Sequence, residues 1–357
     1  MDPRKFSFVA TMAWACLAAC SDEAPSGRYG PGELNHSALR PAELKGRLFA
    51  TGDYLAAPAE MVVAGERLLV IDAMSDSALH VIDTRTGRHV RSLGGRGEGP
   101  GEYRGPWSLA SERRRPGQPW VYDLQLARLT RVDLRPGAAP AAQAEIVRIQ
   151  GEALAIQPVW TQDSLLVSPS LSARGRLSFY GPDGTFRRAA GPLPQGGGGV
   201  PPAILQQAWM GTLVSNPQTG WLALVTQHAD QVEIYRPDGS LVRRVRGPFR
   251  FDPRFTVEQM QGQPVMAQGD AMRFGYTDAE ATAGEIYALF SGRTREAYKA
   301  ASSFGRFVHV YDWQGELKRV YELDSDVVAI ALSPDGKRLY GIGEEPEPAI
   351  VVFSLDG

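Results

Sequence analysis

Short runs of alternating apolar and polar residues recur along most of the chain from about residue 44. Runs such as Leu68–Asp72 and Ala78–Ile82 are rich in β-branched and large apolar residues, and Gly, Pro and Asp cluster between them. Little of this region has the 3.6-residue apolar spacing of an amphipathic helix. The pattern predicts an all-β protein.

One longer pattern occurs several times in this region. It consists of an aromatic strand end, a turn closed by glycine, and an alternating strand that ends in basic residues. The clearest copies begin at Tyr180, Tyr235 and Tyr311, and weaker copies begin at Ile82 and Val132. The turn glycines are at positions 87, 137, 184, 239, 315 and 357. Glycine suits these turns because their last position requires a positive φ.

A β-hairpin is expected ahead of each turn. We predict the pairs Leu68–Asp72 with Ala78–Ile82, Trp120–Asp123 with Arg128–Val132, and Trp221–Val225 with Gln231–Tyr235. Four strands in a unit of about 40–55 residues is the size of a β-propeller blade. The sequence therefore predicts a six-bladed β-propeller.

The sixth blade needs a strand from elsewhere in the chain. Its turn glycine is Gly357, and no strand follows it. The edge left unpaired would be exposed and prone to association. We predict that Arg47–Thr51 closes the ring by pairing with Ile350–Phe353. Deletion of residues 21–53 should then prevent folding.

The spacing between Gly239 and Gly315 indicates an insertion. These glycines are 76 residues apart, and we place the extra residues within 249–300, chiefly in segments 252–264 and 294–301. Such an insertion either forms a binding element over one face of the propeller or is a neutral surface loop.

The first twenty residues have the features of a targeting segment. Arg4 and Lys5 are followed by the apolar run Phe6–Leu17, which is too short to span a bilayer but suits a secretory signal peptide. The sequence Leu17-Ala-Ala-Cys20 resembles the lipobox of bacterial lipoproteins. The resemblance implies that the Cys20 thiol receives a diacylglycerol and that the chain is cleaved just before it.

Three segments follow from this: a lipoprotein signal peptide at 1–19, a flexible tether at 20–42 and the propeller at 43–357. The tether is polar and rich in Gly and Pro. Ser21 follows the cysteine, which under the usual sorting rule favours the outer membrane, although Asp22 comes next. We therefore expect an outer-membrane lipoprotein of the bacterial envelope, facing the periplasm or the surface.

Cysteine content and charge exclude several functions. Cys16 and Cys20 are the two cysteines, and the mature domain would keep neither as a free thiol. Disulfides, thiolate metal sites and thiol catalysis are thereby excluded. The formal net charge of −2 provides no field that would attract nucleic acid.

Four segments resemble the TolB-like six-bladed propeller lipoproteins of bacteria, a family that grades into the NHL-type propellers. They are Glu285–Arg293, Val308–Gly315, Tyr321–Asp324 and Val328–Ala331. The resemblance covers about residues 45–357 and implies the propeller fold. These motifs mark blades and carry no chemistry, and the family has no agreed biochemical activity.

No local motif for catalysis, metal binding or a cofactor is evident. The five histidines form no metal-ligand spacing, and no Gly-x-Ser-x-Gly motif occurs. His80 and His309 lie in similar runs, ALHVID and FVHVYD, which indicates a repeated structural position. Asp72 and Asp123 end equivalent strands. They either face the channel or a rim as candidate binding residues, or cap strand ends.

The segment GGRGEGPGEYRG at 94–105 first suggests a phosphate-binding loop. It lacks the GK[ST] sequence and the following helix that such a loop requires. We interpret it as the connection from the outer strand of one blade to the inner strand of the next, with Glu98 or Glu102 paired to Arg96 or Arg104. If it is a ligand site instead, the candidate residues are Arg96, Glu98, Glu102 and Tyr103.

The sequence favours a lipid-anchored envelope propeller that binds a protein, a glycan or a small ligand, or that acts as a scaffold. Its expected partners are the membrane, through Cys20, and an envelope protein or glycan. The alternative is an enzyme of the lactonase or quinoprotein dehydrogenase type with a site in the central channel. The scarcity of asparagine, present only at 35 and 216, speaks against the calcium-dependent lactonases.

Overall fold

A computed structural model describes most of the chain from Leu34 onward. The described residues are 34–356 except 73, 113, 114, 116, 136–143, 152, 153, 163, 197, 300–304 and 344–346. The predicted signal peptide, Cys20 and residues 20–33 of the predicted tether lie outside them. Residues from Pro31 to Gly357 form one compact unit. None of the helices in the described residues has the length and apolar character needed to cross a membrane.

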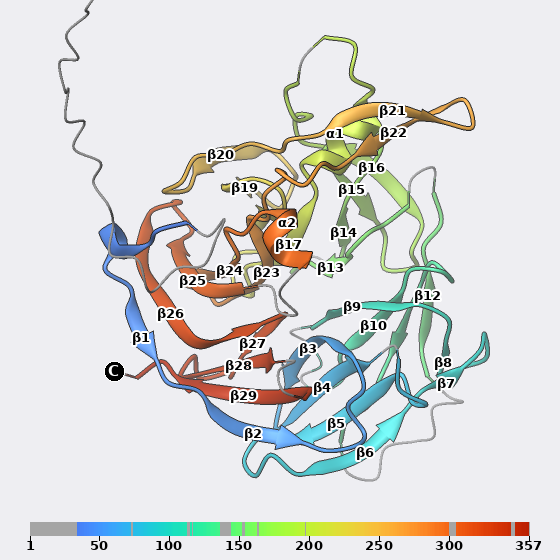
Figure 1. Cartoon of the computed structure of the whole chain (residues 1–357). Helices are drawn as coiled ribbons and strands as arrows, with labels where there is room; N and C mark the ends of the chain where they lie inside the picture. Colours follow the sequence, from blue (N-terminus) through green and yellow to red (C-terminus); the bar gives the residue numbers. More distant parts are fainter. Residues whose placement is uncertain are drawn as a thin grey trace, which may run out of the picture. The chain divides into compact units, whose positions relative to one another are not determined.

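Six β-sheets are arranged around a central axis in this unit (Figure 1). In the described residues, five of them have four strands and the other has five. Each sheet is a blade whose strands follow one another from the centre outward. The predicted all-β, six-bladed propeller is therefore confirmed.

The first three blades are built from consecutive strands. Blade one contains β3 (Pro58–Ala64), β4 (Arg67–Asp72), β5 (Leu79–Asp83) and β6 (His89–Leu93). Blade two contains β9 (Pro106–Ala110), β10 (Trp120–Asp123), β11 (Arg128–Arg131) and β12 (Ile146–Arg148). Blade three contains β13 (Val159–Trp160), β14 (Leu166–Pro169), β15 (Leu177–Tyr180) and β16 (Phe186–Ala190).

The last three blades include two strands from the N-terminal part of the chain. Blade four contains β17 (Gly211–Ser215), β18 (Leu222–Thr226), β19 (Gln231–Tyr235) and β20 (Leu241–Arg246). Blade five contains β23 (Tyr276–Ala281), β24 (Glu285–Phe290), β25 (Gly305–Asp312), β26 (Leu317–Val327) and β1 (Ala42–Leu44). Blade six contains β27 (Ile330–Leu332), β28 (Arg338–Gly343), β29 (Ala349–Ser354) and β2 (Arg47–Thr51).

The three predicted hairpins are present as antiparallel pairs. β4 pairs with β5, β10 with β11, and β18 with β19. The turn glycines 87, 184, 239 and 315 each have a φ between +72° and +84° and lie between the third and fourth strands of a blade. Side chains other than glycine adopt this conformation rarely, which explains the repeated residue.

The predicted closure of the ring is confirmed. β2 is the outer strand of blade six and pairs antiparallel with β29, with Arg47 opposite Val352 and Thr51 opposite Ala349. Ala50 is buried in an apolar cluster that joins blade six to blade one through Ile350, Ile342 and Leu68. A strand from one end of the chain thus covers the edge left by the other end.

The last part of the predicted tether, from residue 34 to residue 42, belongs to the folded unit. Residues 34–44 lie against blade five, where β1 adds in parallel to the edge strand β26. A short 3₁₀ helix, η1 (Ser37–Leu39), precedes β1. The imidazole of His36 is fully buried and stacks on the ring of Phe307 at 3.5 Å between centroids. A polar, Gly- and Pro-rich composition does not reveal this contact, because one aromatic side chain anchors the segment.

The core lies between neighbouring blades. Leu69 and Val81 of blade one pack with Leu109 and Val121 of blade two in one cluster. Similar clusters join blades two and three, three and four, and five and six. The facing sides of these blades are therefore buried. Burial of each large apolar side chain contributes roughly 1.5–3 kcal/mol to folding.

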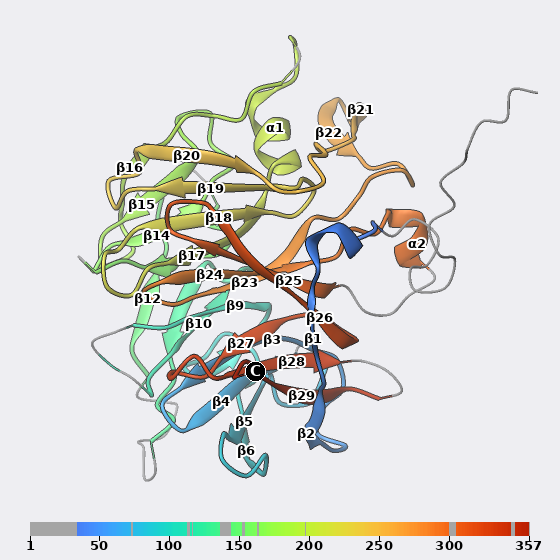
Figure 2. The same cartoon turned by 90° about the vertical axis from the view of Figure 1, so that its left-hand side faces the viewer.

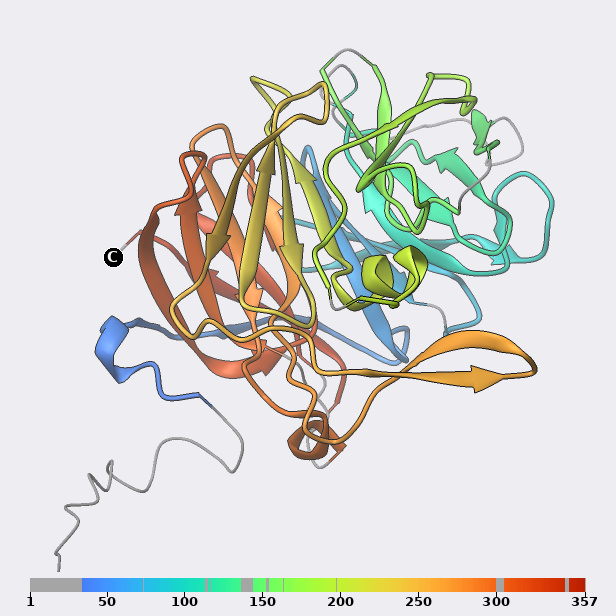
Figure 3. The same ribbon diagram turned by 90° about the horizontal axis from the view of Figure 1, so that it is seen from above.

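The predicted insertion consists of a projecting hairpin and a short helix. The hairpin comprises β21 (Thr256–Met260) and β22 (Gln263–Ala267), and the helix is α2 (Arg295–Lys299). A second helix, α1 (Pro202–Ala208), lies between blades three and four in the sequence and contacts β22. Figures 2 and 3 show the hairpin and α2 projecting from the same side of the ring.

Candidate functional site

A cavity of about 340 Å³ lies at the centre of the ring. Residues from all six blades line it, because the innermost strands converge on the axis of the propeller. Lining residues include Val62 from β3, Leu109 from β9, Trp160 from β13, Ser215 from β17, Glu280 from β23 and Pro334 from the turn after β27. A concave, mostly apolar site with a few convergent polar groups is the usual form of a ligand pocket.

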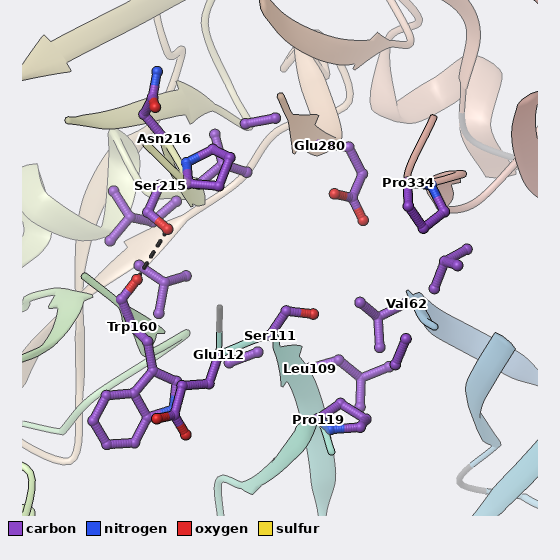
Figure 4. Close-up of a pocket in the computed structure, with 18 of the residues that line it drawn as sticks. Val62, Leu109, Ser111, Glu112, Pro119, Trp160, Ser215, Asn216, Glu280 and Pro334 are labelled. Atoms are coloured by element: carbon purple, nitrogen blue, oxygen red, sulfur yellow. Dashed lines mark hydrogen bonds between the residues drawn. The ribbon is translucent and has the colours of Figure 1, made fainter. Parts of the chain in front are cut away.

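Two carboxyl groups reach this cavity without a cationic partner in the described residues. Glu60 lies on β3 of blade one and Glu280 on β23 of blade five, and both side chains are half-buried. In Figure 4 the carboxyl group of Glu280 points into the space between Ser111, Ser215 and Val62. A third acid, Glu112, differs because it accepts hydrogen bonds from Arg131 and from the indole of Trp120.

Asp278 lies beside Glu280 on β23 and is hydrogen-bonded to the backbone of blades five and six. It is two residues before Glu280, so both side chains lie on the same face of β23. Its carboxylate accepts hydrogen bonds from the backbone N–H of Ala279 at 2.8 Å and of Ile330 at 2.7 Å. The second bond fixes the start of β27 in the neighbouring blade.

Burial makes ionisation of these acids unfavourable. It raises the pKa of Glu280 to about 8, and the nearby charge of Asp278 adds to the rise. Burial, together with the charges of Asp278 and Glu280, also raises the pKa of Glu60 well above its ordinary value. Burial raises the pKa of Asp278 as well. Strongly shifted carboxyl groups in a cavity mark a candidate functional site.

The described residues contain no group of three or more His, Cys, Asp or Glu side chains that could hold a metal ion. Glu60, Asp278 and Glu280 therefore do not form a three-ligand metal site in this geometry. What they offer is hydrogen-bond donors when protonated and acceptors when ionised.

Asp72 and Asp123 occupy equivalent positions in blades one and two, and neither lines the cavity. Asp72 accepts hydrogen bonds from the backbone N–H groups of Ala56 and Ala57, just before β3. Asp123 accepts them from Arg104 and Gly105, just before β9. In blade three the hydroxyl of Ser168 accepts the matching bonds from residues 156 and 157. These side chains hold the chain just before the innermost strands of blades one, two and three.

The loop at 94–105 connects β6 of blade one to β9 of blade two, as the sequence predicts. It contains a two-residue parallel pair, β7 (Gly95–Arg96) with β8 (Glu102–Tyr103). The buried guanidinium of Arg128 donates hydrogen bonds to three of its carbonyls, those of residues 98, 99 and 102. One arginine thus fixes the path of the glycine-rich chain.

The four candidate residues of this loop are in different environments. Glu98 pairs with Arg104 at 2.8 Å, which is one of the predicted ion pairs. The carboxylate of Glu102 accepts a hydrogen bond from the N–H of Gly99. Tyr103 is buried in the apolar cluster between blades one and two, and Arg96 is exposed. The loop does not bring these four side chains together around a cavity.

The repeated histidines have structural contacts of different kinds. His80 contacts the hydroxyl of Ser92 at 2.9 Å and lies 3.8 Å from the Asp72 carboxylate. His309 is buried in blade five and contacts His36 and Tyr276. His80 and His309 both lie on the third strand of their blade, each three residues before the aspartate that ends the strand. The repeat predicts this equivalence.

Sequence reasoning did not identify Glu60, Asp278 or Glu280. They come from strands more than 200 positions apart in the chain, so no local motif contains them. One signal is present in the sequence. Asp278 and Glu280 alternate with Ala279 and Ala281 in a short run that follows Tyr276. Charged residues at such positions are unusual.

Comparison with solved structures identifies proteins of similar fold. A member of the DUF4221 family from Bacteroides vulgatus ATCC 8482 matches with a TM-score of 0.55 and 9% identity, over 87% of this chain and 97% of the other. A protein from Bacteroides fragilis NCTC 9343, provisionally named as exported, matches with a TM-score of 0.50 and 11% identity, over 88% and 95%. At such identities the likeness concerns the fold alone. No curated protein sequence matches the chain.

A family model provides the assignment that the fold alone cannot. The model described as "TolB-like 6-blade propeller-like" matches residues 43–335. The match starts at the strand that joins blade five and extends past the first strand of blade six. The predicted resemblance is therefore confirmed, and the chain belongs to the TolB-like six-bladed propeller family.

Proposed function

We propose that this protein is a lipid-anchored binding module of the bacterial cell envelope whose ligand occupies the central cavity. The observation that supports this most directly is the pair of carboxyl groups, Glu60 and Glu280, at a cavity of about 340 Å³ enclosed by six blades. A closed ring is a rigid platform, so the groups around its axis are held in fixed positions before a ligand arrives.

The composition of the cavity indicates the kind of ligand. Val62, Leu109 and Val159 supply apolar walls. Glu60 and Glu280 favour a group that donates hydrogen bonds or carries a positive charge, because such a group compensates an ionised carboxylate that is otherwise poorly solvated. A small ligand with an apolar body and an amine or hydroxyl end fits both features.

The proposed location follows from the N-terminal sequence. Leu17-Ala-Ala-Cys20 has the form of a lipobox, and lipid attachment at Cys20 would hold the propeller at the membrane. Palmitate labelling of the full-length chain in a bacterial host tests this step, with Cys20→Ser as the comparison. We expect the unmodified chain to incorporate palmitate and to be found in the membrane fraction, and the Cys20→Ser variant to do neither.

The binding role is tested by native mass spectrometry of the protein purified from the envelope in mild detergent. We expect a bound mass on the unmodified protein that is absent from a Glu60→Gln, Glu280→Gln double variant. Glu258→Gln, on the exposed strand β21, is the matched control and should retain the mass. Equal retention by the double variant would contradict binding in the cavity.

A second candidate function is hydrolysis of a lactone in the same cavity. It is favoured by two carboxyl groups that reach one space from different blades, because one can activate water while the other protonates the leaving oxygen. Water would add to the carbonyl carbon, the ring C–O bond would break, and the proton would pass to the released alkoxide. Assay with γ-butyrolactone and homoserine lactone tests this, and loss of activity in either single Gln variant is the expected result.

A further inference from the structure

The course of the strands gives the ring two different faces. Each blade starts in the chain at its innermost strand, and neighbouring strands within it are antiparallel, except that β1 is parallel to β26. Turns from the first to the second strand, and from the third to the fourth, therefore lie on one face, which we call the turn face. Turns from the second to the third strand, and the connections between blades, lie on the opposite face, which we call the connection face.

The central cavity extends toward the turn face. Its lining includes the turn from the first to the second strand in five of the blades. One residue from each of these turns is Gly65, Gly117, Gln162, Asn216 and Pro334. The polar groups of the proposed binding site are thus reached from the turn face.

The insertion and the first described residues lie on the connection face. The hairpin β21–β22 belongs to the connection from blade four to blade five, and α2 lies between the second and third strands of blade five. Leu34 packs near Gly292 in the same turn, where an added Cβ would be 3.4 Å from the Leu34 side chain. Figures 2 and 3 show η1, α2 and the hairpin on one side of the ring.

Exposed apolar side chains are concentrated on the connection face. Eight large apolar side chains are exposed in the part of the chain that the structure describes, and five of them belong to this face. These five are Met74, Trp107, Leu154, Val257 and Met260. The other three are on the outermost strands β2, β6 and β20. None of the eight is therefore on the turn face.

The insertion also presents arginines on this face. The side chains of Arg250 and Arg254 are exposed and form no hydrogen bond or ion pair within the described residues. Burial, and then the charge of the nearby Arg254, lowers the pKa of Arg273. Guanidinium groups brought together in this way favour an anionic partner such as a lipid phosphate. Glu258 is an exposed acid on β21, so the apolar side chains make the larger contribution to any contact with lipid.

The length of chain before Leu34 places a bilayer near the connection face. Cys20 is 14 positions before Leu34, and 14 residues span at most ~50 Å when fully extended. A lipid on Cys20 would therefore keep the end of the chain at Leu34, and the face on which it lies, close to the membrane. This step rests on the lipid attachment proposed above.

We propose that the connection face docks on the phospholipid surface, with Trp107, Leu154 and Met260 at the level of the headgroups. Apolar side chains gain free energy when they leave water, and an indole is well suited to the membrane interface. Arg250 and Arg254 then contact lipid phosphates. Docking in this orientation turns the central cavity away from the membrane, so that its ligand enters from the aqueous side.

The test attaches the protein to vesicles without relying on Cys20. A chain that starts at residue 21 contains no cysteine and keeps the whole compact unit of residues 31–357. An N-terminal hexahistidine tag holds it on vesicles of phosphatidylethanolamine and phosphatidylglycerol that contain a nickel-chelating lipid. Single cysteines at Met260, at Trp107 or, on the turn face, at the exposed Gln218 each carry a nitrobenzoxadiazole fluorophore.

Quenching of the fluorophore by iodide reports whether each position lies in the lipid interface. We expect vesicles to lower the quenching at 260 and 107 about threefold or more, because these labels enter the interface, and to leave it unchanged at 218. Equal quenching at all three positions would overturn the proposal and leave the face open to a partner protein. Protection at 218 alone would also overturn it. Protected labels together with failed palmitate labelling at Cys20 would contradict the lipid anchor and not the docking.

A pair of substitutions tests the part played by the hairpin. Met260→Asp places a charge at the hairpin tip and should remove most of the protection of the label at 107. Val242→Asp, at an exposed apolar side chain on the outermost strand β20, is the matched control and should leave that protection unchanged. Both side chains are exposed, so neither change should affect folding. Equal protection in the two variants would contradict docking through the hairpin.

Discussion

Nε2 of His36 lies 3.2 Å from Nε2 of His309, although the two residues are 273 positions apart in the chain. Nδ1 of His36 lies 3.0 Å from the carbonyl of Leu34. Because a carbonyl only accepts, the proton of His36 is on Nδ1, and its Nε2 accepts a hydrogen bond from His309. Burial disfavours a charge on His309, and the contact joins the N-terminal segment to blade five.

Protonation of this pair should loosen the N-terminal segment. Burial, and then the neighbouring His36, lowers the pKa of His309 well below its ordinary value. The folded state thus takes up this proton less readily than the unfolded state, so the contribution of His309 to stability is complete above about pH 6.5 and is lost as the pH falls below it. Tyr276, Tyr311 and Asp230 also face this site. His228, whose pKa burial lowers to about 4, adds to the same trend.

His36→Ala should lower the free energy of unfolding by about 3 kcal/mol, because it removes a buried ring and leaves the N–H of His309 without its partner. The exposed Lys45→Ala in the same segment is the control and should change it by less than about 0.5 kcal/mol. Urea unfolding at pH 8 and pH 5.5 measures both variants. The variant should also depend less on pH in this range, and an unchanged pH dependence would contradict the lowered pKa of His309.

Ring closure by β2 leads to a second prediction. Ala50 is 5% exposed and faces the cluster between blades six and one, whereas Leu48 is 59% exposed. Ala50→Asp would place an unpaired charge in that cluster and should lower stability by at least about 3 kcal/mol. Leu48→Asp should change it by no more than about 0.5 kcal/mol. Thermal unfolding distinguishes the two, and similar melting temperatures would show that β2 does not hold the ring closed.

The glycine-rich loop provides a third prediction. Arg128→Met leaves three carbonyls of residues 98–102 without their donor and should cost about 3 kcal/mol of stability. Glu98→Ala breaks only an exposed ion pair and should cost at most about 0.5 kcal/mol. Melting temperatures of the two variants test whether the loop is a structural joint. If Glu98→Ala changes binding of an envelope partner while stability is kept, the loop is a ligand site instead.

The propeller could be predicted because its signals are local and repeated. Each turn glycine needs only its own backbone conformation, and each hairpin shows as two adjacent alternating runs. Even the ring closure followed from counting strands, since Arg47–Thr51 was the one run without a partner. The anchoring of His36 had no such signal, because its partners Phe249, Phe290 and Phe307 are more than 200 positions away.

The candidate sites could not be predicted for a related reason. A cavity at the axis of a propeller takes one or two side chains from each blade, so Glu60 and Glu280 meet only when the ring is closed. The chemistry lies between repeats, whereas the sequence pattern describes the repeats themselves.

The fourth prediction concerns the acids of the central cavity above neutral pH. Glu280 has a pKa raised to about 8, so the folded state retains a proton that the unfolded chain releases near pH 4.5. Its contribution is fully present below that pH and is lost as the pH rises toward 8. Between pH 7 and 8 the folded state keeps His228 and His309 neutral, because burial lowers their pKa, so the acids dominate the trend. The melting temperature should fall over this interval, and Glu280→Gln should flatten the fall and raise stability at pH 8.

Glu258→Gln on the exposed hairpin is the control and should leave the pH dependence of the melting temperature unchanged. A ligand with a cationic end should reduce this fall in melting temperature, because it stabilises the ionised carboxylates. If the melting temperature of the unmodified protein does not respond to pH between 7 and 8, these acids do not lie in a poorly solvated channel.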